Sequence, residues 1–429
     1  MQYGLIGEQL GHSFSKEIHG RIADYEYELR ELRPEELDGF MRTKDFRAVN
    51  VTIPYKQAVM PYLDEITDRA GTIGSVNTIV NKNGRLTGDN TDFAGMSVLI
   101  DKLKLNLQGR KVLILGTGGT SKTAQAVVGD RGAGEIYKVS RGGRKEEDLA
   151  VITYEEAMST HSDAQIIINT TPVGMYPRMD ECPIDVFEFP QLEGVIDAIY
   201  NPLCTNLILD ARERGLPAEG GLYMLSGQGV YACGAFLDRE MSKSDIDKAF
   251  REVLKEKQNI VLTGMPSCGK TTIGRLIADR YGKAFIDTDE LVTEMIVEAG
   301  DSNAPFGYEI ADYISRKGET SFRDLETEVV KTACREGGKV IATGGGAILR
   351  RENIRAMKQN GPVIFIDRSL EKLIATSDRP LSSSPEALRQ RYIERRDIYL
   401  GSADIIVDGD GDIKTVLSRA LRAIENYEY

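Results

Sequence analysis

The sequence has no tryptophan, few histidines and no long hydrophobic run. Its three histidines (His12, His19 and His161) do not have the near-sequence spacing of a helical metal site, which argues against zinc chemistry. Without eighteen consecutive apolar residues, no segment is expected to span a bilayer. The N-terminal residues lack a basic lead and a long apolar core, so we expect a first strand there instead of a signal peptide.

Cysteine and positive charge are also scarce. The five cysteines are scattered and odd in number, which favours reduced thiols over disulfides and predicts a cytoplasmic protein. The formal net charge of -12 argues against nucleic acid or an anionic membrane as the main partner. The net charge does not argue against anionic small molecules as ligands, because local positive charges in a site can outweigh the electrostatic field of the whole protein. Nothing in the sequence indicates an oligomeric state.

The length of 429 residues favours two or three domains, and 41% hydrophobic residues suffice for ordinary globular cores. From Lys111 onwards, short apolar runs alternate with glycine-containing loops and helical stretches. This alternation predicts an α/β fold with parallel sheets wrapped by helices. The predicted strands are 47–53, 75–80, 111–115, 135–140, 165–169, 194–200 and 259–263, and the predicted helices are 122–130, 242–259 and 272–282.

A glycine loop, Gly116–Ser121, directly follows the predicted strand 111–115 and opens a helix. Glycines there allow a tight turn and let backbone N–H groups approach a pyrophosphate at the helix N-terminus. We therefore interpret Gly116, Gly118, Gly119 and Thr120 as candidate dinucleotide-binding residues. The third glycine comes too early for G-x-G-x-x-G, so a purely structural strand-to-helix turn is the alternative.

The end of the next predicted strand bears on the choice of cofactor. Ser140 and Arg141 stand there, with Arg144 close behind. A carboxylate at this place would bind the free ribose hydroxyls of NAD, whereas arginines suit the 2′-phosphate of NADP. The alternative is that both arginines are solvated loop charges.

Five further motifs, at residues 7–16, 50–56, 74–78, 88–92 and 221–228, together resemble the shikimate dehydrogenase family. That family reduces 3-dehydroshikimate to shikimate with NADPH. The resemblance implies a substrate-binding domain at 1–100, completed by helices at about 222–257, and a Rossmann-type NADP domain at 101–221. One departure is Ser140-Arg141-Gly142, where many relatives have Asn-Arg-Thr.

The resemblance implies that Lys56 and Asp92 handle the proton. Hydride addition builds negative charge on the ketone oxygen, and a lysine ammonium can stabilise that charge and deliver the proton. A surface ion pair is the alternative for these two residues, and an N-cap or turn role is the alternative for the serines below. The implied substrate-binding residues are Ser13, Ser15, Thr52, Asn77, Asp92, Tyr200 and Gln228, and Asn169, Thr170 and Gly221 are implied to lie beside the cofactor.

A second phosphate loop, Gly264–Thr271, fits G-x-x-x-x-G-K-[ST] in full, between a predicted strand and a predicted helix. Its backbone N–H groups would bind phosphate oxygens, Lys270 would reach the β- and γ-phosphates, and Thr271 would bind Mg²⁺. The predicted ATP-binding residues are Ser267, Cys268, Gly269, Lys270, Thr271 and Thr272.

Motifs at 285–291, 318–326, 342–348, 378–381 and 395–399 resemble the shikimate kinase family, which phosphorylates the 3-hydroxyl of shikimate from ATP. The resemblance implies a P-loop kinase domain at 258–429. It also implies that Asp289 orients the attacking hydroxyl and that Asp287 helps to hold Mg²⁺. The alternative for both aspartates is neutralisation of a helix dipole.

The same resemblance implies that Arg323 and Arg395 hold the substrate carboxylate, because a planar fork of donors suits that group. Glu326 would brace Arg323, and Gly345 would leave room for the substrate. Arg379 would close over the nucleotide on a lid and stabilise the transferred charge. This lid departs from the family in its serine-rich end and in the missing basic residue upstream.

The sequence therefore predicts a bifunctional enzyme with NADP(H), ATP and Mg²⁺ as cofactors and 3-dehydroshikimate and shikimate as small-molecule substrates. Two alternatives remain. In the first, the N-terminal part prefers quinate or NAD. In the second, the chain is a catalytically degenerate scaffold that senses shikimate.

Overall fold

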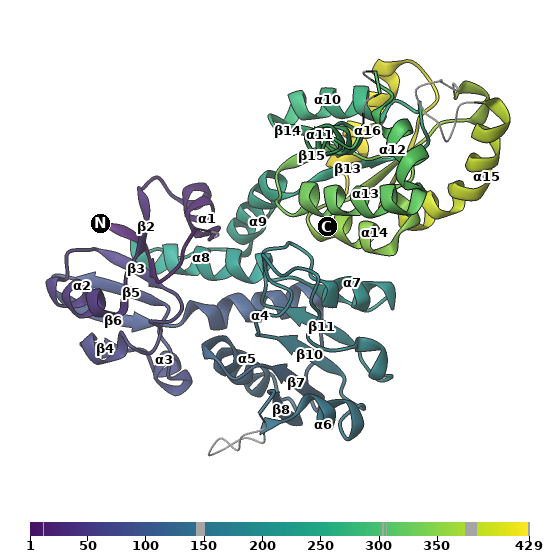
Figure 1. The fold of residues 1–429 in the computed structure, drawn as a ribbon. Coiled ribbons are helices and arrows are strands. Elements are labelled where there is room, and N and C mark those ends of the chain that lie inside the picture. The colour runs from purple at the N-terminus through teal and green to yellow at the C-terminus, as the bar shows by residue number, and fades with distance from the viewer. Residues whose placement is uncertain (12, 143–150, 303, 306, 374–383, 428–429) are drawn as a thin grey trace. The chain divides into compact units, whose positions relative to one another are not determined.

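The structure is a computed structural model of the 429-residue chain. It describes the chain except for His12, residues 143–150, Asn303, Phe306, residues 374–383 and residues 428–429 (Figure 1). The chain divides into two compact units, Met1–Glu256 and Lys257–Tyr429, here called the N-terminal unit and the C-terminal unit. Among the described residues, no helix combines the length and the apolar character needed to cross a membrane.

The N-terminal unit begins with a mixed sheet in the strand order β2-β1-β3-β5-β6-β4. Its strands are β1 (Tyr3–Gly7), β2 (Tyr27–Glu31), β3 (Ala48–Val51), β4 (Glu65–Ile66), β5 (Thr78–Lys82) and β6 (Arg85–Asp89), and its helices are α1 (Ser15–Ile22), α2 (Leu37–Thr43) and α3 (Asp68–Ile73). Strands β1, β2 and β3 are parallel, whereas β5 is antiparallel to both β3 and β6. The buried strand β3 therefore lies next to the polar start of β5.

A second sheet in the N-terminal unit is entirely parallel among its described strands, in the order β9-β8-β7-β10-β11-β12. The strands are β7 (Lys111–Leu115), β8 (Glu135–Val139), β9 (Val151–Ile152), β10 (Ile166–Asn169), β11 (Gly194–Asp197) and β12 (Ala218–Glu219), and the helices are α5 (Gly119–Asp130), α6 (Tyr154–Ser159) and α7 (Asn206–Glu213). This is the 3-2-1-4-5-6 order of dinucleotide-binding sheets, in which the ligand crevice lies where the order reverses, between β7 and β10.

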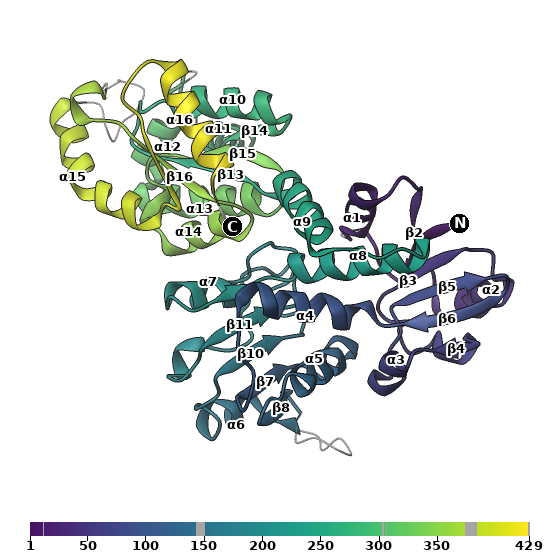
Figure 2. The ribbon, with the colours of Figure 1, turned by 180° about the vertical axis from the view of Figure 1, so that it is seen from behind.

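Helices α4 (Thr91–Leu103) and α8 (Leu222–Leu237) run side by side between the two sheets in both views (Figures 1 and 2). Glycines allow their close approach, because a Cβ at Gly95 would lie 2.5 Å from the Met224 carbonyl oxygen and one at Gly227 would lie 2.7 Å from Val98. The amphipathic helix α9 (Lys243–Lys257) then leads to the C-terminal unit. The tight α4–α8 contact fixes residues from distant parts of the sequence against one another.

The C-terminal unit contains a parallel sheet in the order β14-β15-β13-β16-β17. Its strands are β13 (Ile260–Thr263), β14 (Ala284–Asp287), β15 (Lys339–Ala342), β16 (Val363–Asp367) and β17 (Ile405–Asp408), and its helices are α10 (Lys270–Tyr281), α11 (Thr288–Glu298), α12 (Glu309–Lys317), α13 (Glu319–Cys334), α14 (Arg351–Gln359), α15 (Pro385–Ser402) and α16 (Ile413–Glu425). Alternate residues of β13 enter different cores, with Ile260 and Leu262 in one cluster and Val261 in another. Burial on both faces explains the unbroken apolar sequence of this strand.

The predicted α/β fold with parallel sheets is confirmed, although several elements end elsewhere than expected. The strand predicted at 75–80 begins only at Thr78. Gly74 ends α3 with φ +67, and the N–H of Val76 then donates to the Lys56 carbonyl oxygen at 2.9 Å. The helix predicted at 122–130 begins already at Gly119, so the glycine loop itself forms the first helical turn.

Candidate active sites

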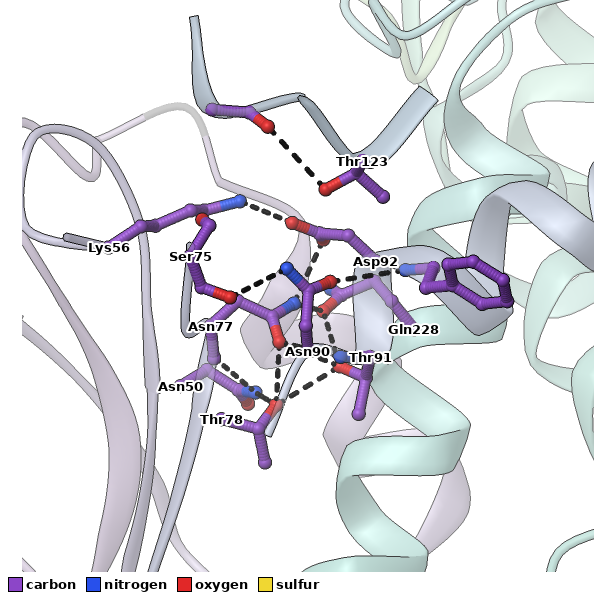
Figure 3. A network of polar contacts seen from close by, with 12 residues as sticks. Asn50, Lys56, Ser75, Asn77, Thr78, Asn90, Thr91, Asp92, Thr123 and Gln228 are labelled. Atoms are coloured by element: carbon purple, nitrogen blue, oxygen red, sulfur yellow. Dashed lines mark hydrogen bonds and ion pairs between the residues drawn. The ribbon is translucent and has the colours of Figure 1, made fainter. Parts of the chain in front are cut away.

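The centre of the N-terminal site is an ion pair between Lys56 and Asp92, whose Nζ and Oδ2 atoms lie 2.5 Å apart (Figure 3). Lys56 lies in the turn after β3, and Asp92 lies in the first turn of α4, where the helix dipole favours a carboxylate. Only 15% and 10% of the two side chains are exposed. The pair is therefore largely shielded from water, unlike an ordinary surface ion pair.

The amide of Asn77 connects this pair to the neighbouring elements. Its Nδ2 donates to Asp92 Oδ1 at 2.9 Å and to Gln228 Oε1 at 3.2 Å, and its Oδ1 accepts from the Thr91 N–H at 2.8 Å. Gln228 comes from α8, which is 151 residues away in the sequence. The structure thus brings four predicted residues, Lys56, Asn77, Asp92 and Gln228, into one buried cluster.

A second group of predicted residues, Ser13, Ser15 and Tyr200, also comes together in the N-terminal unit. Ser13 Oγ donates to Ser15 Oγ at 3.1 Å and accepts from the Ser15 N–H at 3.3 Å. Burial raises the pKa of Tyr200, while its hydrogen bond with Ser13 lowers it. Thr52 begins the turn that leads to Lys56, since its carbonyl accepts from the Tyr55 N–H at 2.9 Å. Hydroxyl groups at this place suit a ligand carboxylate.

The glycine loop lies at the carboxyl end of β7, where the order of the parallel sheet reverses. Gly116 has φ +106, and a Cβ there would lie 2.9 Å from Thr170 Oγ1. Gly118 is the N-cap of α5, and Gly119 and Thr120 form its first turn. The hydroxyls of Ser75 and Ser121 are buried without a hydrogen-bond partner in the described part of the chain, and a Cβ at Gly119 would lie 3.6 Å from Ser75 Oγ. Unsatisfied hydroxyls beside a helix N-terminus fit a phosphate-bearing ligand.

The other predicted cofactor residues lie around the same sheet edge. Ser140 follows β8, and its N–H donates to the Ile152 carbonyl oxygen at 2.9 Å. Arg141 is exposed in the next turn, and Arg144 lies outside the described residues. Gly221 precedes α8 against the Ala198 carbonyl, where a Cβ would clash.

Asn169 ends β10 and binds a fully buried carboxylate. Its Nδ2 donates to Asp197 Oδ1 at 3.0 Å, and its Oδ1 accepts from the N–H of Thr171 at 3.0 Å. Thr205 and the N–H of Ile199 also donate to Asp197. Burial raises the pKa of Asp197 from 3.8 to about 6, although these donors lower it. Asn169 is therefore held by the sheet, and Thr170 faces Gly116.

The phosphate loop of the C-terminal unit connects β13 to α10. Gly264, Ser267 and Gly269 have φ values of +146, +63 and +101, a conformation that turns successive N–H groups inwards. Lys270 Nζ donates to the Gly264 and Met265 carbonyl oxygens at 2.9 and 3.1 Å. The lysine is buried against its own loop, where a phosphate group could replace the two carbonyls as its partner. Cys268 is buried in the same loop, and Thr272 is exposed one residue beyond Thr271.

The predicted magnesium residues lie together in the C-terminal unit. Thr271 Oγ1 donates to Asp287 Oδ2 at 2.8 Å, and Asp287 Oδ1 accepts from the Asp289 N–H at 3.0 Å as the cap of α11. A hydroxyl and a carboxylate oxygen side by side suit a hard cation such as Mg²⁺. Asp289 lies against Gly344, where a Cβ would clash with its carboxylate. The helix-capping role and the metal role are thus both compatible with Asp287.

The two predicted carboxylate-binding arginines differ in their partners. Arg323 donates to Glu326 at 2.7 Å and to Glu319 at 2.9 Å, and its Nε is buried without a hydrogen-bond partner among the described residues. Burial lowers the pKa of Arg323, but the charges and hydrogen bonds of Glu326 and Glu319 together outweigh burial and raise the pKa overall. Arg395 donates to the Gly345 carbonyl oxygen at 2.9 Å, and burial lowers its pKa. Two buried guanidinium groups with one unsatisfied donor fit an anionic ligand.

Tyr399 joins these two parts of the C-terminal site. Its hydroxyl lies 3.0 Å from the carbonyl oxygen of Gly264 and 2.5 Å from that of Gly345. Its ring stacks on Phe365 with the centroids 4.9 Å apart. The side chain therefore lies between the carbonyl that binds Lys270 and the carbonyl that binds Arg395.

Sequence reasoning missed several residues of these sites. The N-terminal network also includes Tyr27, Asn50 and Thr78, and the C-terminal site includes the Tyr399 hydroxyl. Polar side chains inside short apolar strands were the available signal for Asn50 and Thr78, because such residues need buried partners. The predicted lid residue Arg379 lies outside the described residues.

Comparisons with known proteins match the two units to two families. The family model for shikimate kinase matches residues 266–425, and that for the shikimate dehydrogenase substrate binding domain matches residues 5–79. The shikimate dehydrogenase (NADP(+)) of Clostridium beijerinckii is 37% identical over 243 residues, covering 54% of this chain and 89% of that protein.

Two crystal structures resemble the N-terminal unit. Shikimate dehydrogenase 1 from Peptoclostridium difficile is 35% identical with a TM-score of 0.55, covering 59% of this chain and 98% of that one. Shikimate 5-dehydrogenase from Thermus thermophilus, in complex with NADP(H) and shikimate, is 28% identical with a TM-score of 0.53 and covers 59% of this chain and 99% of its own.

Proposed function

Because the chain belongs to the shikimate dehydrogenase family and its residues 266–425 match the shikimate kinase family, we propose that it catalyses two consecutive reactions. The N-terminal unit reduces 3-dehydroshikimate to shikimate with NADPH, and the C-terminal unit phosphorylates shikimate to shikimate 3-phosphate with ATP and Mg²⁺. These steps lead towards chorismate and the aromatic amino acids, in the cytoplasm. One observation carries the proposal: two unlike phosphate loops, in two separate units, accompany residues suited to one cyclic hydroxy acid.

In the N-terminal unit, Lys56 and Asp92 act as the proton-handling pair. When bound, NADPH supplies the hydride that reduces the ketone carbon. Lys56 then gives a proton to the developing alkoxide, and Asp92 keeps the ammonium oriented at 2.5 Å. Ser13, Ser15 and Tyr200 hold the substrate carboxylate, while Thr52, Asn77 and Gln228 hold the ring hydroxyls. The shielding of the ion pair from water strengthens the attraction between Lys56 and Asp92.

NADP is favoured over NAD because Arg141 is exposed directly after β8, where a 2′-phosphate would lie. Gly116, Gly118, Gly119 and Thr120 bind the pyrophosphate at the N-terminus of α5. Ser140 also contacts the 2′-phosphate, as does Arg144, which lies outside the described residues, and Asn169, Thr170 and Gly221 lie beside the nicotinamide half.

In the C-terminal unit, Asp289 orients the 3-hydroxyl of shikimate, and Arg323 and Arg395 hold its carboxylate beside Gly345. When bound, ATP with Mg²⁺ supplies the phosphoryl group. Lys270 neutralises the phosphates, and Thr271 and Asp287 hold the metal. Ser267, Cys268, Gly269 and Thr272 complete the ATP-binding residues, and the resemblance assigns Arg379, which lies outside the described residues, to the charge of the transferred phosphoryl group. Since phosphoryl transfer depends mainly on positioning and charge, these residues suffice for the chemistry.

Two assays on one purified sample of the full chain test the proposal. Shikimate with NADP⁺ should give NADPH absorbance, and shikimate with ATP and Mg²⁺ should give ADP. Faster turnover with quinate or with NAD⁺ in the first assay would support the quinate or NAD alternative. A chain that binds shikimate but is inert in both assays would be the sensing scaffold, and the proposal would be wrong.

A further inference from the structure

We propose that Tyr27, Asn50 and Thr78 form a one-directional hydrogen-bonded chain that positions Asn77 and, through it, the Asp92 carboxylate. The inference rests on the proposed function and deepens it, because none of the three residues contacts the proton-handling Lys56. Tyr27 donates to Asn50 at 2.8 Å, Asn50 to Thr78 at 3.1 Å, Thr78 to Asn77 at 3.0 Å and Asn77 to Asp92 at 2.9 Å. Figure 3 shows the part of this chain from Asn50 to Asp92.

The orientation of the Asn50 amide is fixed by a backbone group. Its Nδ2 lies 3.2 Å from the Asn77 carbonyl oxygen, which can only accept. The nitrogen must therefore face Asn77 and Thr78, and the oxygen must face Tyr27. Because that oxygen can only accept, the Tyr27 hydroxyl must donate. Burial raises the pKa of Tyr27, so the hydroxyl keeps its proton.

The orientation of the Asn77 amide is fixed in the same way, but by a donor. The Thr91 N–H lies 2.8 Å from Asn77 Oδ1 and can only donate. The oxygen must therefore face Thr91 and Thr78, which leaves the Asn77 nitrogen facing Asp92. The two backbone groups fix the direction of both amides, since a reversed amide would place two acceptors or two donors together. The Thr78 hydroxyl accepts from Asn50 and has two acceptors at 3.0 Å for its proton, Asn77 Oδ1 and Thr91 Oγ1.

The surroundings of the chain exclude water. Tyr27, Asn50, Thr78 and Asn77 are all buried, with at most 3% of each residue exposed. The ring of His19 stacks on Tyr27 at a centroid distance of 4.0 Å, and burial lowers the pKa of His19 to about 3, so this neighbour stays uncharged. In such surroundings successive hydrogen bonds polarise one another, and the last donor binds the carboxylate more strongly.

The chain determines how Asp92 meets Lys56. Asn77 binds Oδ1 of the carboxylate, so Oδ2 stays directed at Lys56 Nζ. The Thr91 N–H still holds the Asn77 amide when the upstream donors are lost, but Asn77 Oδ1 then loses one of its donors and the amide is less polarised. Its hydrogen bond to Asp92 Oδ1 would weaken, and the carboxylate would hold the ammonium less firmly towards the ketone oxygen. Tyr27, Asn50 and Thr78 are thus positioning residues, not groups that touch the substrate.

The test compares Thr78→Val with Thr78→Ser in the full chain. Valine has nearly the same shape but breaks the chain, whereas serine keeps the hydroxyl. We expect Thr78→Val to lower the dehydrogenase kcat about 3- to 10-fold, the usual weight of one buried hydrogen bond, with a smaller rise in the KM for shikimate because Asn77 also holds a ring hydroxyl. Thr78→Ser should restore kcat. A matched control is Thr87→Val on the neighbouring strand β6, where Thr87 pairs with Val80 and should have no effect.

Tyr27→Phe is the second variant, because it keeps the ring against His19 and removes only the donor. It should also lower kcat, and the rise in KM should again be smaller than the fall in kcat. Kinase activity of each sample measures the amount of active chain, and thermal unfolding reports on the fold. An unchanged kcat in both variants, a raised KM at constant kcat, or no rescue by serine overturns the positioning role while the dehydrogenase assignment stands. A wild-type chain without dehydrogenase activity overturns both.

Discussion

The two candidate sites differ in what their proposed catalytic lysines bind. In the N-terminal unit, Lys56 binds the side chain of Asp92, its partner in the proposed proton-handling pair. Both residues belong to one largely buried hydrogen-bond network. In the C-terminal unit, Lys270 binds two carbonyl oxygens of its own loop at 2.9 and 3.1 Å. The first site is therefore assembled by the fold, whereas in the second the lysine must exchange backbone partners for phosphate. Redox chemistry needs a prepared proton donor, and phosphoryl transfer needs a cation that moves with its nucleotide.

The two sites also differ in how far acidic side chains compensate the charge of the basic ones. Asp92 compensates Lys56 within the N-terminal cluster. In the C-terminal site Glu326 and Glu319 compensate Arg323, but Arg395 donates to the Gly345 carbonyl and burial lowers its pKa. A ligand carboxylate would restore the balance there. The C-terminal site is thus the one in which an anionic substrate completes the electrostatics.

The largest effect that separates the sites should come from Lys56→Ala. It removes the proton donor, so we expect dehydrogenase activity to fall about 10²- to 10⁴-fold, the range for general acid–base catalysis. Kinase activity of the same sample should be unchanged. A suitable control is Lys44→Ala, because Lys44 also lies 3.2 Å from an aspartate, Asp64, but at the surface. Equal losses of dehydrogenase activity in Lys56→Ala and Lys44→Ala would mean that the loss of an ion pair, and not the loss of a proton donor, lowers the activity.

Lys270→Ala is the reciprocal change and should have the next largest effect. Loss of one preorganised cation at the transferred phosphoryl group should lower the kinase kcat about 10²- to 10³-fold, with dehydrogenase activity retained. Lys283→Ala is the control, since Lys283 also donates to a carbonyl, that of Gln258, at 2.9 Å. If Lys270→Ala changed only the KM for ATP, the lysine would bind ground state and transition state alike.

The sequence predicted the fold class and the two phosphate loops because those signals are local, whereas Lys56, Asn77, Asp92 and Gln228 were placed in one site by the resemblance to the shikimate dehydrogenase family. Neither the pattern nor the resemblance predicted that Asn77 donates directly to Gln228, since Gln228 is 151 residues away and arrives through the α4–α8 contact. Asn50 and Tyr27 were not predicted as part of the site for a related reason. A short strand pattern tells which face is buried, but not which polar group of another strand it meets.

The buried carboxylates of the two units offer a weaker contrast. Glu326 has a guanidinium partner, whereas the donors to Asp197 are the uncharged groups of Asn169, Thr205 and Ile199. Burial raises the pKa of Asp197 from 3.8 to about 6. The folded state therefore binds more protons than the unfolded state between these pH values, and stability falls as pH rises.

Asp197→Asn should remove that pH dependence. Relative to the variant, the free energy of unfolding of the wild-type N-terminal unit should fall by up to about 3 kcal/mol from pH 4 to pH 6 and stay level above. Urea unfolding followed by loss of dehydrogenase activity, at several pH values, measures the difference. A difference that is constant with pH would mean that the carboxyl group is equally charged in both states.

The smallest effect concerns Tyr399, which lies between the two halves of the C-terminal site. Its hydroxyl approaches the Gly264 carbonyl, which also accepts from Lys270, and the Gly345 carbonyl, which also accepts from Arg395. Tyr399→Phe keeps the stacking on Phe365 and leaves each carbonyl one donor. The fold should therefore tolerate the change.

The single proton of the Tyr399 hydroxyl is shared between two carbonyls, of which that of Gly345 is the nearer. Tyr399→Phe should therefore raise the kinase KM for shikimate about 2- to 10-fold and the KM for ATP less, with dehydrogenase activity unchanged. Tyr281→Phe is the matched control, since Tyr281 packs against the hydrophobic cluster that contains Tyr399. Tyr281 is the last residue of α10, whereas the phosphate loop lies at the first residues of that helix. A rise in the KM for only one of the two ligands would mean that the hydroxyl supports the binding site of that ligand alone. The C-terminal site would then consist of two independent halves, and its contrast with the fully connected N-terminal network would be sharper than the hydrogen bonds of Tyr399 indicate.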